Sequence, residues 1–250
     1  MKEKIHTIPV NDGFHSGDEC PFCYMRREAE RRVIRYVAGP GASYMEPEVR
    51  EITDRMGFCA HHMKNLYDYG NPLGNALMLQ TYYARLLEDF RKERETFIQP
   101  EKKNLFGKRK PSAAEPYWQR LAARDGSCYI CDRVEQTMQR YYQTFFRMLG
   151  DPEFRDRVAG SKGFCMHHFE KLLELAELYL PNAQADWFYE TVFSLMEENL
   201  VRVKEDLDWM IALYDYRNIG APLKNSQDAL QRTMQKLKGG YPADRPYKEK

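Results

Sequence analysis

The chain has 250 residues, of which 43% are hydrophobic and 30% are charged, and its formal net charge is +1. This composition excludes a disordered or membrane-embedded chain, and the near-zero charge gives no global basic field for nucleic acid. The sequence has no long apolar run and no apolar signal-peptide core at its N-terminus. We therefore expect a cytoplasmic protein with no membrane partner.

Glycine and proline divide the first half of the chain into segments that are rich in helix-forming residues. The predicted helices are 20–37, 46–56, 59–69 and 73–97. Pro47 suits the first turn of the second helix, and Gly57 and Gly70 suit the ends of the second and third. In the fourth helix, apolar residues recur at helical spacing, as in an amphipathic helix.

The second half repeats this order of segments. The predicted helices are 128–149, 152–158, 165–180, 183–217 and 226–238. An apolar stripe runs along 183–217 at the spacing that suits packing against another long helix. No segment alternates like a strand, so the predicted fold class is all-α.

A loop-forming stretch separates the two halves. We predict a first helical repeat with an N-terminal arm over 1–98, a linker over 99–116, and a second repeat with a C-terminal helix over 117–250. The linker carries five basic residues, which are Lys102, Lys103, Lys108, Arg109 and Lys110. They could form a patch for phosphate or nucleic acid, but the balanced charge favours a solvated linker.

All six cysteines lie in short motifs that occur twice. Cys20-Pro-Phe-Cys23 is followed by Gly57-Phe-Cys59-Ala-His-His62, and Cys128-Tyr-Ile-Cys131 is followed by Gly163-Phe-Cys165-Met-His-His168. The offset between the copies is 108 residues at the first motif and 106 at the second. The chain therefore contains an internal repeat.

Each copy of the motifs supplies three thiols and one imidazole, the donor set that zinc prefers in a tetrahedral structural site. Residues three apart in the first turn of a helix share a face, which selects His62 over His61 and His168 over His167. We therefore predict two zinc ions, one in each repeat. The predicted ligands are Cys20, Cys23, Cys59 and His62 in the first repeat, and Cys128, Cys131, Cys165 and His168 in the second.

Helix N-termini at these motifs would offset the negative charge of three thiolates on one zinc ion. The alternative cofactor is an iron–sulfur cluster, which thiolates also bind. A thioredoxin-like redox pair is not expected because it needs a βαβ context, and disulfides are not expected in a cytoplasmic protein. His61 and His167 could serve a substrate, a second metal or proton transfer, or could be duplicated surface residues. No residue is assigned a catalytic role.

The motifs as a set resemble a known family. They are the arm Met1–Asp12, the Cys20–Cys23 pair, Tyr44-Met-Glu-Pro47, the doubled Gly-Phe-Cys-x-His-His, and Asp215-Tyr-Arg-Asn218. Together they resemble an uncharacterised family of bacterial cytosolic proteins, a domain of unknown function. The resemblance implies that the Cys and His positions bind metal, and it implies no substrate, reaction or partner.

We expect two zinc-stapled repeats about a pseudo-twofold axis, with 73–97 and 183–217 as spine helices. Because four-ligand zinc sites are closed, the expected function is a non-enzymatic scaffold or adaptor that binds another protein. The alternative is a metal- or cofactor-dependent enzyme, or a metal-handling protein, with a small-molecule cofactor between the repeats. Nucleic-acid binding is not expected, because no helix carries a basic stripe.

Overall fold

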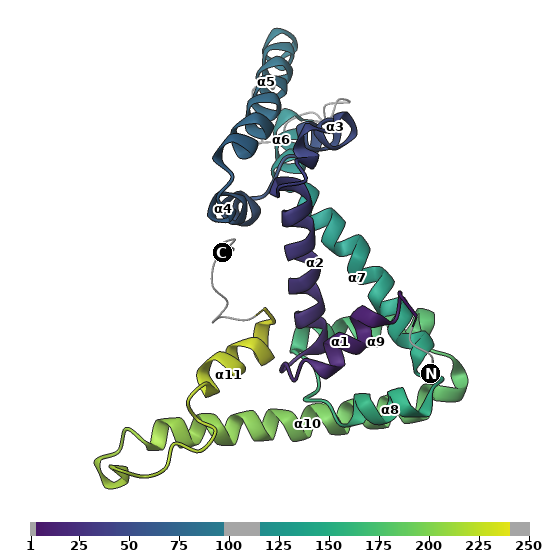
Figure 1. Ribbon diagram of the computed structural model, residues 1–250, viewed down its shortest axis with the longest axis vertical. Helices are drawn as coiled ribbons and strands as arrows, with labels where there is room; N and C mark the ends of the chain where they lie inside the picture. The colour runs from purple at the N-terminus through teal and green to yellow at the C-terminus, as the bar shows by residue number, and fades with distance from the viewer. Residues whose placement is uncertain (1–3, 98–115, 241–250) are drawn as a thin grey trace, which may run out of the picture. The chain divides into compact units, whose positions relative to one another are not determined.

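The computed structural model describes residues 4–97 and 116–240, which form helices and connecting loops (Figure 1). The α-helices are α1 (Ile8–His15), α2 (Pro21–Ala38), α3 (Pro47–Met56), α4 (Ala60–Tyr69), α5 (Pro72–Thr96), α6 (Tyr117–Asp125), α7 (Tyr129–Met148), α8 (Pro152–Ala159), α9 (Met166–Tyr179), α10 (Asn182–Ala212) and α11 (Ala229–Lys238). Two short 3-10 helices are η1 (Ser43–Met45) and η2 (Tyr216–Asn218).

No strand occurs within these described residues, so the all-α prediction is confirmed there. None of the described helices is both long enough and apolar enough to cross a lipid bilayer. The predicted linker 99–116 and its five basic residues lie outside the described residues, except for Pro116.

The described residues form two compact units, and each takes segments from both halves of the sequence. The first unit contains 4–29 and 135–240, and the second contains 30–97 and 116–134. The helices α2 and α7 each begin in one unit and end in the other. The pseudo-twofold arrangement and the domain boundaries stay predictions.

Aromatic side chains fill the core of the first unit. Phe14 from α1 stacks on Phe145 of α7, with ring centroids 5.8 Å apart, and meets Phe154 of α8 edge-on at 5.3 Å. Phe22 of α2 stacks on Tyr142 at 4.8 Å between centroids. The N-terminal arm therefore packs across the helices as a helix of its own, because Phe14 is buried among these rings.

The second unit is built on α5, which α3 and α4 both contact. Its buried residues include Ile34, Val37, Val49, Leu66, Met78, Tyr129 and Ile130. Pro47 and Pro72 occupy the first turns of α3 and α5, where a missing backbone N–H costs no hydrogen bond. These proline positions are among the signals that made both helices predictable.

Candidate metal centres

The eight predicted ligands gather into two Cys3His tetrads, but not in the predicted combination. Cys20, Cys23, Cys165 and His168 form one tetrad, called centre 1 here. Cys59, His62, Cys128 and Cys131 form the other, called centre 2. The prediction that each repeat builds its own centre is wrong, because each centre joins the Cys-x-x-Cys pair of one repeat to the Cys-x-x-His pair of the other.

The length of α2 explains this exchange. Cys20 and Cys23 lie at the beginning of α2, whereas the chain reaches Cys59 only after passing the end of α2 and all of α3. An α2 of 18 residues is a rod of about 27 Å, at about 1.5 Å per residue. It carries the chain away from its own Cys-x-x-Cys pair before the Cys-x-x-His pair begins.

Local geometry places each ligand pair at the N-terminus of a helix, as predicted. Gly57 and Gly163 have φ values of +63° and +73°, a conformation that favours glycine and lets the chain turn sharply before α4 and α9. Cys59 and Cys165 are then the N-cap residues of these two helices. Two helix N-termini with partial positive charge therefore lie at each centre.

The donor atoms of centre 1 are close together and fully buried. The Nδ1 atom of His168 lies 3.4 Å from Sγ of Cys20, 3.4 Å from Sγ of Cys23 and 3.1 Å from Sγ of Cys165. The Sγ atoms of Cys23 and Cys165 are 3.6 Å apart. Each of the four side chains belongs to the buried core of the first unit.

Centre 2 repeats these distances with less burial. The Nδ1 atom of His62 lies 3.2 Å from Sγ of Cys59 and 3.3 Å from Sγ of both Cys128 and Cys131. The Sγ atoms of Cys59 and Cys131 are 3.8 Å apart. His62 and Cys128 are buried, whereas Cys59 and Cys131 are partly exposed.

These separations fit one tetrahedral zinc ion in each centre. Zinc bonds of ~2.3 Å to sulfur and ~2.0 Å to nitrogen place tetrahedral donors ~3.8 Å (sulfur to sulfur) and ~3.5 Å (sulfur to nitrogen) apart. The donor distances given above lie from 3.1 to 3.8 Å, and all four donor atoms of each centre lie within 4.8 Å of one another. An iron–sulfur cluster would place several iron and sulfide atoms between its ligands, so the geometry favours a single ion.

Hydrogen bonds within each tetrad favour a thiolate, the form that binds metal. The pKa of the Cys165 thiol is lowered to about 4, first by hydrogen bonds from the Cys20 and Cys23 thiols and then by hydrogen bonds from the backbone N–H groups at the start of α9. Burial raises the pKa of Cys128, but hydrogen bonds from His62 and from backbone N–H groups lower it to about 6. Each centre therefore has one thiol that is readily deprotonated.

Glu30 of α2 lies behind the imidazole of His62. Its Oε1 atom is 2.7 Å from Nε2 of His62 and 3.3 Å from Nε2 of His61. A carboxylate that accepts a hydrogen bond from the second ring nitrogen fixes the tautomer with Nδ1 free for the metal, and makes the imidazole a stronger donor. Glu30 was not predictable from the sequence, because an acidic residue within a charged helix carries no spacing signal.

The imidazole of centre 1 has no such carboxylate. Among the described residues, Nε2 of His168 is buried and has no hydrogen-bond partner. Counting from the Cys-x-x-Cys pairs, the position of α7 that corresponds to Glu30 is Met138, which is fully buried. The ring of His168 instead lies near Phe22, with centroids 5.8 Å apart. His62 and His168 thus occupy the same position in their tetrads, but His62 has a carboxylate next to its second ring nitrogen and His168 has apolar neighbours.

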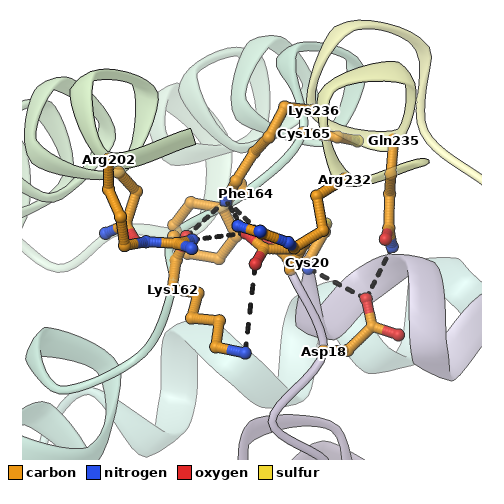
Figure 2. A network of polar contacts seen from close by, with 12 residues as sticks. Asp18, Cys20, Lys162, Phe164, Cys165, Arg202, Arg232, Gln235 and Lys236 are labelled. Atoms are coloured by element: carbon orange, nitrogen blue, oxygen red, sulfur yellow. Dashed lines mark hydrogen bonds and ion pairs between the residues drawn. The ribbon is translucent and has the colours of Figure 1, made fainter. Parts of the chain in front are cut away.

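The C-terminal helix α11 covers centre 1 through a buried polar network (Figure 2). Lys236 is 1% exposed, and its Nζ donates to the backbone carbonyls of Glu19, at 2.7 Å, and of Lys162. Gln235 donates to the Asp18 carboxylate at 2.6 Å, which also accepts from the backbone N–H of Cys20 at 3.0 Å. One helix thereby holds both loops that lead into the ligands of centre 1.

Gly239 lets the chain after α11 lie against the sulfur atoms. Its φ is +76°, and a Cβ at this position would be 3.3 Å from Sγ of Cys165 and 3.5 Å from Sγ of Cys23. Burial lowers the pKa of the Lys236 ammonium, and the negative charge of Glu19, with which Lys236 also pairs, opposes that shift. Centre 1 is therefore closed and has a cation beside it.

The second histidine of each motif stays outside the Cys3His tetrads. The side chain of His61 is 67% exposed, and its Nε2 lies 3.0 Å from the Asn65 amide. His167 is an exposed residue at the start of α9. The pKa of its imidazole is lowered by partial burial and by the neighbouring His168. The choice of His62 and His168 over these two residues agrees with the helical spacing.

Fold and site together define an all-α protein with two Cys3His groups that are able to hold metal ions. The family model described as a family of unknown function (DUF6062) matches residues 1–244. The chain belongs to this family, which confirms the resemblance drawn from its motifs. No curated protein and no solved structure matches the chain.

Proposed function

We propose that this protein is a non-enzymatic scaffold or adaptor whose two structural zinc ions fasten the two halves of its sequence together. The observation that carries this proposal is the exchanged ligand set, in which both centres take one helix N-terminus from each repeat. The zinc ion of centre 1 then joins ligands that are 142 residues apart (Cys23 and Cys165), and that of centre 2 joins ligands that are 66 residues apart (His62 and Cys128). Closing such long loops makes metal binding contribute directly to folding.

The donor count supports a structural role over a catalytic one. Each centre offers four protein ligands, and zinc with four protein ligands has no open position for a substrate or a reactive water. The scaffold therefore acts through its surface rather than through its metal.

An exposed apolar stripe on α5 supports a protein as the partner. Leu79, Tyr83, Leu87 and Phe90 follow one another at intervals of three or four residues along α5 and are between 42% and 61% exposed. Side chains at this spacing share one helix face, which is the form in which helices present apolar anchors to another protein.

Metal analysis tests this proposal. The purified full chain should contain two zinc ions, and a strong chelator that removes them should abolish cooperative thermal unfolding, because structural zinc contributes on the order of 10 kcal/mol in small zinc domains. Restoring zinc should restore the transition. A chain that purifies without zinc, or one that melts identically with and without it, would overturn the proposal.

A further inference from the structure

The two centres have the same donors but unequal access to solvent. All four ligands of centre 1 are at most 1% exposed, and Gly239 lies over two of its sulfur atoms. In centre 2, Cys59 and Cys131 are partly exposed, because Cys59 caps α4 at the surface of the second unit. A small reagent in solution therefore meets partly exposed ligand residues at centre 2 and only buried ones at centre 1.

The charged groups next to the two centres also make the reactivity of their sulfur atoms differ. A zinc ion with three thiolates and a neutral imidazole carries a net charge of about −1. At centre 1 the Lys236 ammonium is paired with the Glu19 carboxylate at 3.3 Å, whereas at centre 2 the Glu30 carboxylate is hydrogen-bonded to the ligand imidazole itself. A carboxylate–imidazole pair adds electron density to the metal site, so the sulfur atoms of centre 2 are the stronger nucleophiles.

The two accessible sulfur atoms also lie close enough to react with each other. Sγ of Cys59 and Sγ of Cys131 are 3.8 Å apart, and a disulfide bond requires ~2.05 Å. Cys59 lies at the N-cap of α4 and Cys131 in the first turn of α7, so a rotation of either side chain can shorten this distance.

We propose that centre 2 is an oxidation site, at which a hydroperoxide joins Cys59 and Cys131 in a disulfide and releases the zinc ion while centre 1 keeps its own. This inference rests on the proposed zinc binding at both centres. It gives the two centres separate roles, with centre 1 as a permanent fastening and centre 2 as a responsive one.

The chemistry balances with hydrogen peroxide as the oxidant. The first thiolate attacks one peroxide oxygen, the O–O bond breaks, and the departing hydroxide takes up a proton to become water. The second thiolate attacks the resulting sulfenic sulfur, an S–S bond forms, and a second hydroxide leaves and is protonated. Two electrons pass from sulfur to peroxide in total. Only His62 and Cys128 then remain as zinc ligands in centre 2, too few to hold the ion.

The test uses the full chain, purified without oxygen and loaded with two zinc ions. Hydrogen peroxide is added in the presence of a chromogenic zinc chelator, free thiols are then alkylated, and the peptides are mapped by mass spectrometry. We expect one zinc ion per chain to be released at least about tenfold faster than the second, since thiolate exposure governs oxidation. A disulfide between Cys59 and Cys131 should form at the same rate as the release.

Centre 1 serves as the internal control, because Cys23 and Cys165 are also close in space but buried. Release of both zinc ions at one rate, an early disulfide between Cys23 and Cys165, or a zinc-loaded protein that resists peroxide would overturn this inference alone. A protein that never holds zinc would instead overturn the proposed function.

A charge variant tests the contribution of Glu30 to the reactivity of the sulfur atoms. Glu30→Gln keeps the size of the side chain and removes its charge, so the disulfide between Cys59 and Cys131 should form a few-fold more slowly in protein loaded with excess zinc. Glu95→Gln removes an exposed carboxylate from α5 and should leave the rate unchanged. Equal rates for the two variants would contradict a role for Glu30 in the reactivity of centre 2.

Discussion

The carboxylate of Glu30 lies 2.7 Å from Nε2 of His62, although Glu30 belongs to the helix α2, at whose beginning two ligands of centre 1, Cys20 and Cys23, lie. The helix α2 therefore contributes to both centres, with cysteines to one and a supporting carboxylate to the other. This relationship follows from the exchange of ligand pairs between the repeats, and the exchange has consequences for pairs of substitutions.

Double cysteine variants distinguish the exchanged pairing from pairing within a repeat. Cys20→Ser combined with Cys165→Ser alters centre 1 alone, so the chain should retain about one zinc ion, because the other four-ligand site is intact. Cys20→Ser combined with Cys59→Ser alters both centres and should remove both ions. Zinc per chain, measured after gel filtration, gives the answer. The opposite pattern would show that each repeat binds its own ion.

Removal of the Lys236 ammonium should destabilise the first unit. Lys236→Met leaves the carbonyls of Glu19 and Lys162 buried without their donor, which should lower the free energy of unfolding by about 2–4 kcal/mol. Lys204 is the matched control, because its side chain is 72% exposed in an ion pair with Asp208, and Lys204→Met should change stability by less than about 0.5 kcal/mol. Denaturant titration of the zinc-loaded variants measures both. Equal effects would mean that α11 does not fasten the loops of centre 1.

A methyl group at Gly239 should loosen the cover of centre 1. Gly239→Ala adds a Cβ at 3.3 Å from Sγ of Cys165, in a backbone conformation that L-residues rarely adopt. We expect a loss of about 1–3 kcal/mol and faster transfer of the centre 1 zinc to a chelator. Gly220→Ala carries a similar backbone penalty at φ +84° with no atom within 4 Å of its Cβ, and should leave zinc transfer unchanged. If Gly220→Ala accelerates transfer equally, contact with the sulfur atoms is not the cause.

Zinc binding at centre 2 should weaken as the pH falls. Burial and the neighbouring Cys128 raise the pKa of Cys131 to about 12, and hydrogen bonds with Cys128 and Glu30 raise that of His62 to about 10 despite burial. Both groups are therefore protonated at neutral pH and must lose their protons to bind zinc. The zinc-bound state holds fewer protons, so the association constant should rise by at least about a hundredfold per pH unit between pH 6 and 8. Competition with a chelator of known affinity measures this slope, and an affinity independent of pH would refute the assignment of these two ligands.

Most helices were predictable because their ends carry local signals. Pro47, Pro152 and the glycines before Cys59 and Cys165 mark boundaries that the structure reproduces within a few residues. The helix α1 was not predicted, because Asn11, Asp12 and Gly13 favour turns, and burial of Phe14 outweighs that preference. The helix α6 (Tyr117–Asp125) has no buried residue and offered no core-facing pattern.

The ligands themselves were predictable from spacing, but their grouping was not. Helical spacing brings Cys59 to His62 and Cys20 to Cys23, since these contacts lie within one turn. The choice of partner pair depends on where α2 and α7 carry the chain, which is a tertiary property. The supporting groups Glu30, Lys236 and Gly239 also lie more than thirty residues in sequence from the groups that they contact or approach at the two centres, so no local spacing identifies them.

Anomalous X-ray diffraction at the zinc absorption edge is the most direct measurement of how the ligands are grouped. It should show two zinc peaks per chain. One should lie ~2.3 Å from the sulfur atoms of Cys20, Cys23 and Cys165 and ~2.0 Å from Nδ1 of His168, and the other at the same distances from the donors of centre 2. A zinc ion held by Cys20 and Cys23 together with Cys59 and His62, or a single ion shared by all the sulfur atoms, would contradict the exchanged pairing.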